Sequence, residues 1–372
     1  MNRFVAWGLG LCVACAPRAA APPAALTPVS AVRLPRADSV RTTTVAPGVA
    51  HHFLWMGRGP WAIHILDVER QRCTPVLRAV KAGPPLARRA TTSALAAGLA
   101  AINADFFELP RGTTLGAHVS GGRVLISPQQ RPVFAAGVDR FSIGLATLDA
   151  FIAESEDTFR LRHVNRRSSY SASLFDAWAG ESVTDSTASA IRIRVLEPGR
   201  GVVTGFAQPG EPSTLDAAAV VVTGAGAWGN RRSAGDTVVW RARVLDASGR
   251  AAAEVVGGFP LLIEDGRDVL VLQPGVRPAF ADQRHPRSAV AWDDDHLYWV
   301  LVDGRQPPYS EGMSLPELTG LLQGLGATHA LNLDGGGSSA LVVRGRVVNR
   351  PSDAEGERAV ANALVLDSCP LR

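Results

Sequence analysis

The chain has 372 residues, of which 46% are hydrophobic and 19% are charged. This composition excludes an intrinsically disordered chain, and the length allows one large domain or two ordinary ones. The net charge of +4 does not indicate a nucleic-acid-binding protein, because every basic residue except Lys81 is an arginine and the arginines are scattered rather than clustered.

The N-terminus has the features of an export signal. Arg3 precedes a short apolar run, Phe4–Ala16, which is followed by small residues and is too short to anchor the chain in a bilayer. We interpret residues 1–16 as a signal peptide. The end of the run also resembles a lipoprotein signal that would lipidate Cys15, although Cys12 stands where leucine is usual. A lipoprotein of the cell envelope and a secreted or periplasmic protein both remain open.

Residues 17–45 are rich in Ala, Pro, Thr and Arg without a hydrophobic period, and we interpret them as a flexible tether. Residues 46–372 show no break in composition and no internal repeat, which predicts one elaborate domain. A helix is expected over Thr91–Ala101. Strands are predicted at Trp61–Val68, Arg123–Ile126, Ser142–Thr147, Ile191–Val195, Ala219–Thr223, Thr237–Val244, Leu261–Ile263 and Val269–Leu272.

The last third of the chain has the clearest pattern. Ser288–Trp292 and Leu297–Val302 predict a hairpin, and Ser314-Leu315-Pro316-Glu317 is a capping box that starts a helix ending at Gly326. Further strands are expected at Ala330–Leu333, Ala340–Val343 and Val360–Leu366. The order indicates an α+β fold with a large mixed or antiparallel sheet and few helices.

Three patterns that mimic functional motifs have simpler explanations. Gly224–Gly229 matches the dinucleotide-binding G-x-G-x-x-G, but loop residues follow it, so we interpret it as a turn. Asp293–His296 holds possible metal ligands, yet it lies where the predicted hairpin must turn. His51 and His52 have no partner at ligand spacing. No metal signature is found and no cofactor is expected, while a divalent cation at the carboxylates stays open.

If the first two cysteines belong to the leader, Cys73 and Cys369 remain. An exported protein with a remaining pair of cysteines often forms a disulfide. We therefore expect a Cys73–Cys369 bridge between the two ends of the domain.

The segment Leu331–Ala340 carries the strongest chemical signal. A strand delivers Asp334 to its end, and Gly335-Gly336-Gly337 then allow a tight turn whose amides suit a phosphate or carboxylate oxygen. Ser338 adds a hydroxyl. The segment is not a P-loop, because no lysine follows and the next element is a strand.

Other charged residues are expected at neighbouring strand ends. Asp303 and Arg305 follow one strand, Arg287 opens the strand before it, and Arg358 precedes the last strand. Asn103 and Asp105 follow an earlier strand. Carboxylates for proton transfer beside arginines for anion binding favour hydrolysis of a negatively charged substrate.

These motifs resemble the phosphodiester glycosidase family, over roughly residues 95–367. The likeness departs from the family at Ala291-Trp292, where Gly is usual, and at Asp105, which replaces a usually small residue. The motifs that carry it are Asn103–Phe107, Leu115-Gly116, Ser120–Gly122, Gly257-Gly258, Pro286–Ala289, Val302–Arg305, Ser310–Leu318, Asn332–Ser339 and Pro351–Asp353.

The resemblance implies cleavage of a sugar-1-phosphodiester, of N-acetylglucosamine type or a related envelope glycan, at the glycosidic bond. We expect Asp334 and Asp303 to supply the carboxylate chemistry and Asn103 to contact sugar hydroxyls. Arg287, Arg305, Arg358 and the glycine amides are expected to bind the phosphate. The alternative is a non-catalytic protein that binds an envelope glycan or assembles an exopolysaccharide with the same pocket.

Overall fold

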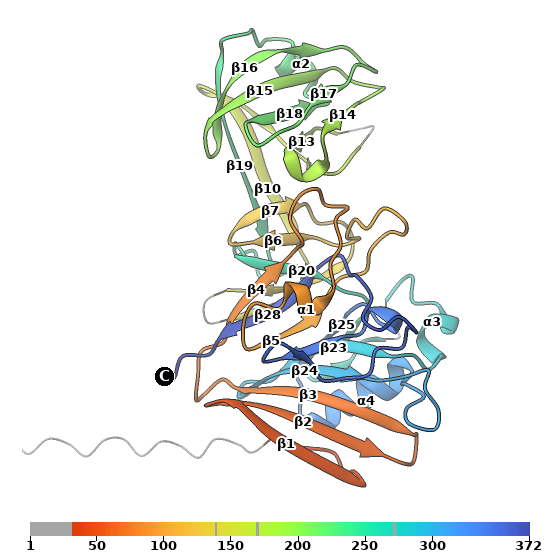
Figure 1. The fold of residues 1–372 in the computed structure, drawn as a ribbon. Helices are drawn as coiled ribbons and strands as arrows, with labels where there is room; N and C mark the ends of the chain where they lie inside the picture. The colour runs from red at the N-terminus through yellow and green to blue at the C-terminus, as the bar shows by residue number, and fades with distance from the viewer. Residues whose placement is uncertain (1–31, 138–139, 169–170, 271–272) are drawn as a thin grey trace, which may run out of the picture.

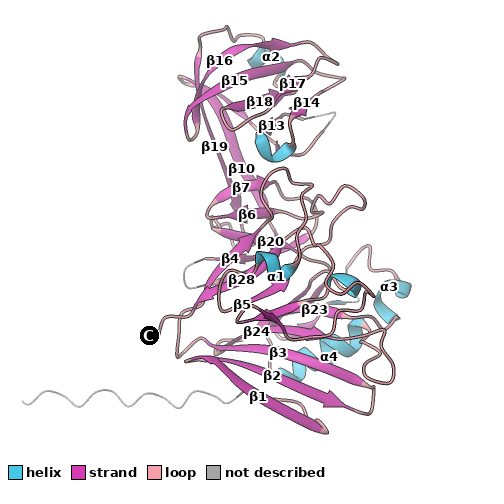
Figure 2. Ribbon diagram, in the orientation of Figure 1, coloured by secondary structure: helices cyan, strands magenta, loops and turns pink. Residues whose placement is uncertain are grey.

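A computed structural model describes residues 32–137, 140–168, 171–270 and 273–372. The predicted signal peptide, Cys15 and most of the predicted tether lie outside these residues. Within them the protein is built mainly of antiparallel strands, with a wide base, a narrower middle and an upper lobe (Figure 1). Helices are few and short (Figure 2), so the predicted α+β fold with a large sheet and one domain is confirmed.

The base is an eight-stranded sheet in the order β1-β2-β3-β24-β23-β25-β21-β22. Its inner strands are apolar on both faces, because helices and other strands cover both. The strands are β1 Ser39–Ala46, β2 Val49–Met56, β3 Trp61–Glu69, β21 Leu261–Glu264, β22 Arg267–Asp268, β23 Arg287–Trp292, β24 His296–Val302 and β25 His329–Asn332.

Two five-stranded sheets form the middle of the molecule. One has the order β27-β26-β5-β28-β4 and the other β7-β6-β20-β8-β9. Their strands are β4 Val76–Val80, β5 Ala100–Asn103, β6 His118–Ser120, β7 Arg123–Ile126, β8 Pro132–Ala136, β9 Phe141–Leu145, β20 Glu254–Gly257, β26 Leu341–Val343, β27 Arg346–Val347 and β28 Ala363–Ser368.

The upper lobe is a second eight-stranded sheet, β11-β10-β19-β16-β15-β18-β13-β12, with the small pair β14-β17 beside it. Long strands β10 and β19 run from the middle into this lobe (Figure 1). The strands are β10 Thr147–Glu154, β11 Asp157–Arg160, β12 His163–Val164, β13 Ser173–Phe175, β14 Ser182–Val183, β15 Ala190–Glu197, β16 Arg200–Ala207, β17 Ser213–Thr214, β18 Ala219–Thr223 and β19 Thr237–Leu245.

The helices are α1 Thr92–Leu95, α2 Gly226–Gly229, α3 Pro278–Asp282 and α4 Leu315–Leu325. Helix α4 starts with the predicted capping box and ends at Gly326 in the left-handed conformation, as expected. None of the helices in the described part of the chain has both the length and the apolar character needed to cross a bilayer.

Three local predictions need correction. Residues 39–45, predicted as tether, form β1, because the run of Thr and Val pairs along β2. Of the predicted helix Thr91–Ala101 only α1 forms, since Gly98 packs against the β28 backbone, where a Cβ would lie 2.6 Å from Leu366 O. Val269 and Leu270 lie beyond β22 rather than in a strand, and the last two residues of that prediction are outside the described part.

Cys73 and Cys369 form the expected disulfide, with their Cα atoms 5.3 Å apart. A bridge between Cys73 and Leu371 pairs the backbone next to it. The disulfide therefore joins the chain just after β3 to the C-terminus. It closes a loop that contains most of the domain.

Candidate active site

The two strand ends that carry aspartates meet where the base sheet contacts the middle of the molecule. Strand β25 leads into Asp334, and β5 leads into Asp105. The Asp334 N–H donates to Ala104 O at 2.8 Å, and the Asn103 side chain donates to Asp334 O. Two strand ends that are more than 200 residues apart in sequence are thus hydrogen-bonded directly to each other, next to Asp105 and Asp334.

Asp334 is half-buried at this junction. Desolvation raises its pKa to about 6, while the Ser338 hydroxyl, the Gly335 N–H and the charge of Arg358 oppose the rise. The carboxyl group is therefore mostly ionised at pH 7 and is more basic than an exposed aspartate. Both properties suit a nucleophile or a general base.

The glycine turn after Asp334 is required by close approach. Gly336 has φ +61°, and a Cβ there would lie 3.1 Å from Arg305 Nη2. A Cβ on Gly337 would lie 2.2 Å from Arg358 Nη2, and one on Gly335 would lie 2.7 Å from Pro286 O. The glycines thus allow two guanidinium groups to lie directly on the backbone beside Asp334.

Two of the three glycine amides are already used within the protein. Gly335 N–H donates to the Asp334 carboxylate at 3.0 Å, and Gly336 N–H donates to Pro286 O at 2.9 Å. The predicted binding of phosphate by the glycine amides stays a prediction, and in the structure these two N–H groups bind within the turn. Ser338 is buried next to Asp334, where its hydroxyl acts on that carboxylate.

Arg305 and Arg358 are the guanidinium groups at this turn. Arg305 is exposed, and its Nη2 lies 3.3 Å from His285 Nδ1. Arg358 is held by a bidentate pair with Asp353, with Nε–Oδ2 at 2.7 Å and Nη2–Oδ1 at 3.0 Å. Arg305 is thus the more available cation, and Arg358 is fixed in place by its carboxylate partner.

Arg287 and Asn103 are placed differently from the prediction. The Arg287 guanidinium is buried and donates to the carbonyl oxygens of Met313, Phe280 and Gln283, and burial lowers its pKa to about 10. It holds the loops around β23 rather than facing a ligand. Asn103 is fully buried and cannot contact a sugar; its Oδ1 accepts from Ser288 Oγ and Ala340 N.

Asp303 belongs to a separate network. Its carboxylate is buried and accepts hydrogen bonds from Asn349 Nδ2 at 3.1 Å, Tyr309 OH at 3.0 Å and the Arg350 N–H at 3.1 Å. Asn349 in turn donates to Ser339 O. The direct role in catalysis predicted for Asp303 stays a prediction; in the structure these three donors occupy its carboxylate and connect it to the segment 349–350.

Asp105 is the carboxyl group that the site assignment missed. It is fully buried, and its Oδ2 accepts the Gly116 N–H at 2.7 Å. Burial raises its pKa to about 7; the Gly116 N–H, Arg131 and Arg166 oppose this, and the charge of Asp334 adds to it. The sequence signal was available, because Asn103-Ala104-Asp105 repeats the Asn-x-Asp pattern of Asn332-Leu333-Asp334 at a second strand end.

Arg131 is a further cation on this side. Its guanidinium lies 4.8 Å from the ring centre of Phe259 and 5.6 Å from that of Phe106. The rings hold the guanidinium without neutralising it. Its charge acts on Asp105, so it contributes to the positive potential around the two carboxyl groups.

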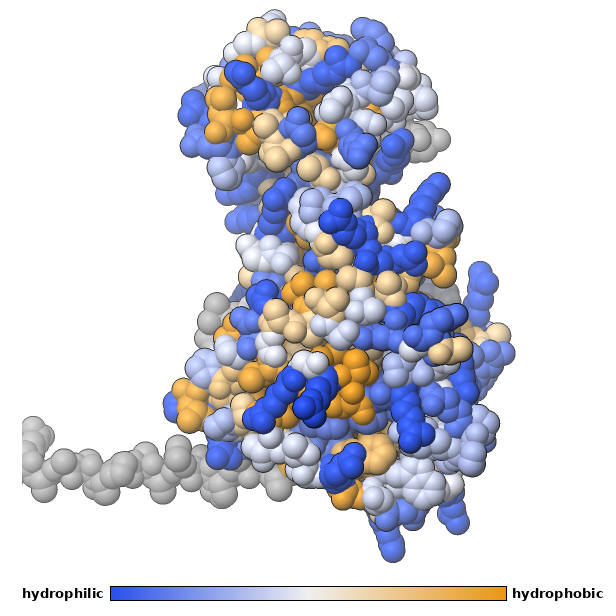
Figure 3. Space-filling model, viewed as in Figure 1, coloured by the Kyte–Doolittle hydropathy of each residue, from blue (hydrophilic) through white to orange (hydrophobic). Residues whose placement is uncertain are grey.

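A polar cavity of about 790 Å³ opens beside Arg166, between the middle of the molecule and the upper lobe. Arg166 donates to Leu115 O and Gly116 O, next to the amide that binds Asp105. Glu108, Arg111 and Arg167 also line this cavity. Figure 3 shows hydrophilic residues over much of the face of the narrow region between the lobes.

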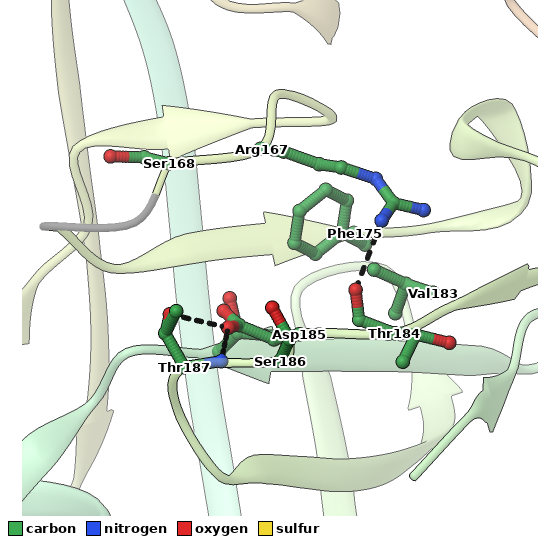
Figure 4. Close-up of a pocket in the computed structure, with 9 residues that line it drawn as sticks. Arg167, Ser168, Phe175, Val183, Thr184, Asp185, Ser186 and Thr187 are labelled. Atoms are coloured by element: carbon green, nitrogen blue, oxygen red, sulfur yellow. Dashed lines mark hydrogen bonds between the residues drawn. The ribbon is translucent and has the colours of Figure 1, made fainter. Parts of the chain in front are cut away.

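A second pocket, of about 160 Å³, lies in the upper lobe away from the aspartates (Figure 4). Its polar groups bind one another: Asp185 accepts from Thr187 N and Oγ1, and Arg167 donates to Thr184 O. Across the described residues no group of three or more His, Cys, Asp or Glu side chains is arranged to hold a metal ion.

The comparisons with solved structures agree on the fold. A hypothetical protein from Synechocystis has a TM-score of 0.72 at 24% identity, covering 90% of this chain and 64% of that protein. A protein of Burkholderia pseudomallei K96243, which its name describes as inferred to be exported, has a TM-score of 0.69 at 20% identity. The match covers 94% of this chain and all of that one.

Two further matches are weaker. The catalytic domain of zebrafish N-acetylglucosamine-1-phosphodiester alpha-N-acetylglucosaminidase has a TM-score of 0.49 at 16% identity, covering 91% of this chain and 87% of that one. A prophage-derived protein of Bacillus subtilis strain 168, YomE, is 38% identical over 84 residues. The chain spans 64% of the Synechocystis protein, and the matched segment is 22% of this chain and 13% of YomE.

A family model matches slightly less than half of the chain. Residues 198–366 match the phosphodiester glycosidase family. This segment contains Asp303, Arg305, Asp334 and Arg358, whereas Asp105 lies before it. The resemblance to the phosphodiester glycosidase family that the sequence motifs indicated is thus confirmed over residues 198–366, the segment that builds the glycine turn.

Proposed function

We propose that this protein is an exported hydrolase that cleaves the glycosidic bond of a sugar-1-phosphodiester. The observation that carries the proposal is the arrangement around one turn: an ionised, half-buried Asp334 with Arg305 and Arg358 against the following glycines. A carboxylate beside two guanidinium groups matches a substrate that carries a phosphate next to the bond to be broken.

In this mechanism Arg305 and Arg358 bind the phosphate and neutralise the charge that develops on it. Water supplies a hydroxyl to the anomeric carbon, the bond from that carbon to the phosphate oxygen breaks, and the electron pair leaves with the phosphate. The products are a free sugar and a phosphomonoester. Because phosphate is a good leaving group, strong acid assistance is unnecessary.

Asp334 acts either as the base that takes the proton of the attacking water or as the nucleophile that forms a glycosyl intermediate. Asp105 has the higher pKa, about 7 against about 6, so near pH 7 it is protonated to a greater extent than Asp334. A neutral Asp105 does not compete with Asp334 for the guanidinium groups.

The test is release of free sugar from an N-acetylglucosamine-1-phosphodiester by the parent protein and by Asp334→Asn. The matched control is Asp294→Asn, because Asp294 is exposed in the β23–β24 turn, at the opposite end of these strands from Asp334. We expect turnover by the parent and the control only. No turnover by the parent, together with retained binding of the phosphodiester, would favour the non-catalytic glycan-binding alternative.

A further inference from the structure

A third pocket lies on the open face of the base sheet, outside the site described above. It has a volume of about 480 Å³ and is formed by β1, β2 and β3 together with the segments around residues 309 and 350. Its lining includes Phe53, Trp55, Tyr309, His64, Arg41 and Arg350. The pocket therefore combines three aromatic rings with two guanidinium groups and one imidazole.

The two arginines are held by rings and not by acids. Arg350 lies 4.0 Å from the ring centre of Tyr309, and Arg41 lies 5.3 Å from that of Phe53. Among the described residues neither guanidinium has a carboxylate partner. Stacking leaves the N–H edges of a guanidinium free to donate, so both arginines retain their capacity to bind an anion.

Both charges act on the Tyr309 hydroxyl. Burial and Asp303 raise the pKa of this hydroxyl, and the charges of Arg350 and Arg41 both oppose the rise. Asp303 lies beneath the pocket, but the Asn349 amide, the Tyr309 hydroxyl and the Arg350 N–H already bind its carboxylate. The open pocket is thus positive.

The floor of the pocket is rigid. His64 is buried, its Nδ1 lies 3.2 Å from His51 Nε2, and its Nε2 lies 3.4 Å from Asp303 Oδ2. Burial lowers the pKa of His51 to about 4, so His51 is neutral, and its Nε2 and the His64 Nδ1 share one hydrogen bond. The histidine that the sequence analysis set aside, His51, thereby fixes the ring at the base of the pocket.

We propose that this pocket binds an anionic sugar residue, one that carries a carboxylate or a phosphate, as a second glycan site. The guanidinium edges of Arg41 and Arg350 bind the anionic group, and the aromatic rings contact the apolar face of the sugar. The segment from Arg350 to Arg358 joins this pocket to the glycine turn, so one acidic glycan can span both sites. The binding itself does not depend on the proposed reaction.

The test is isothermal titration calorimetry at low ionic strength with three probes: tetragalacturonic acid, glucose 6-phosphate and the neutral cellotetraose. All titrations use the Arg305→Gln background, which removes the most available cation at the glycine turn. The double variant Arg41→Gln/Arg350→Gln is compared with Arg267→Gln. Arg267 is the matched control, because it is exposed on β22, at the opposite edge of the same sheet.

We expect at least one anionic probe to bind the background and the Arg267→Gln control, with affinity at least tenfold lower in the double variant. The probe that binds identifies the anionic group. Thermal unfolding of the double variant checks that its fold is retained. Equal binding by the double variant, equally tight binding of cellotetraose, or no binding of either anionic probe would overturn the proposal, whatever the result of the turnover assay.

Discussion

The two Asn-x-Asp strand ends, Asn103-Ala104-Asp105 and Asn332-Leu333-Asp334, share a pattern but differ in environment. Asp334 is half-buried beside two guanidinium groups, whereas Asp105 is fully buried against the Gly116 amide. Burial raises the pKa of both, to about 6 for Asp334 and about 7 for Asp105. The same local sequence therefore produces a half-buried carboxyl group beside guanidinium groups in one place and a fully buried carboxyl group with a higher pKa in the other.

The asparagines differ in the same way. Asn103 binds three groups, the Ser288 hydroxyl, the Ala340 N–H and the Asp334 carbonyl. Asn332 donates to Phe259 O at 2.7 Å, and its side-chain Oδ1 accepts no hydrogen bond from the described residues. Asn103 thus joins the two strand ends, while Asn332 supports only its own side. The position of each asparagine relative to the other sheet, and not the shared motif, therefore determines which groups it binds.

The largest expected effect is on turnover. Asp334→Asn removes the proposed base or nucleophile, and we expect kcat to fall by about 10³-fold or more. Asp105→Asn is expected to lower kcat by less than tenfold, because a neutral amide replaces a group that is already largely neutral. The measurement is sugar release from the phosphodiester at pH 6.5. Equal losses of kcat in the two variants would contradict the different roles proposed for Asp334 and Asp105.

Asp105→Asn is expected to change stability with pH. In the unfolded chain this carboxyl group ionises near 3.8, and in the folded chain near 7, so the folded state binds the extra proton between these values. Its contribution to stability is present below about pH 3.8 and is lost as the pH rises from there through 7, by up to about 4 kcal/mol in total. Denaturant unfolding at pH 5 and 8.5 should show the stability of the variant, relative to the parent, rising from the lower pH to the higher.

The Arg305→Gln variant tests the electrostatic part of the Asp334 site. Loss of the more available guanidinium is expected to lower kcat/KM by about 10²-fold. Arg305→Lys should recover little of this, since an ammonium group cannot bind two phosphate oxygens as a planar fork does. Steady-state kinetics with Arg267→Gln as control measure the effect. Full activity in Arg305→Lys would show that charge alone is sufficient.

The pH profile of the parent enzyme tests the pKa of Asp334. Because the reaction needs the ionised form, kcat/KM is expected to rise with pH and to level off above about pH 6. Below this value it should fall about tenfold per pH unit. A plateau that extends unchanged to pH 4 would contradict the role of a carboxylate with a raised pKa.

The smallest effect concerns the two asparagines. Asn103→Ala leaves the Ser288 hydroxyl and the Ala340 N–H without an acceptor, and is expected to destabilise the fold by about 2–3 kcal/mol. Asn332→Ala removes one hydrogen bond, and about 1 kcal/mol is expected. Denaturant unfolding compares the two. A larger loss from Asn332→Ala would reverse the assignment of Asn103 as the residue that joins the sheets.

Much of the local structure could be predicted from the sequence. The capping box of α4 and the β23–β24 hairpin depend on residues close in sequence, and both form. The Cys73–Cys369 pair followed from counting the cysteines that remain after the leader. The roles of Arg287 and Asp303 could not be predicted, because burial by distant loops directs Arg287 to carbonyl oxygens and supplies three donors to Asp303.

By itself the sequence determined the strand ends, the glycine turn and the family resemblance, and it predicted Asp334 as the central carboxylate. Those features are local, since periodicity and turn residues act over a few positions. Only the tertiary structure decided that Asp105 is the neighbour of Asp334, that Asp303 faces another network, and that Arg41 and Arg350 share a pocket. Sheet order brings these residues together over hundreds of positions, and burial then sets the charge of each carboxyl group.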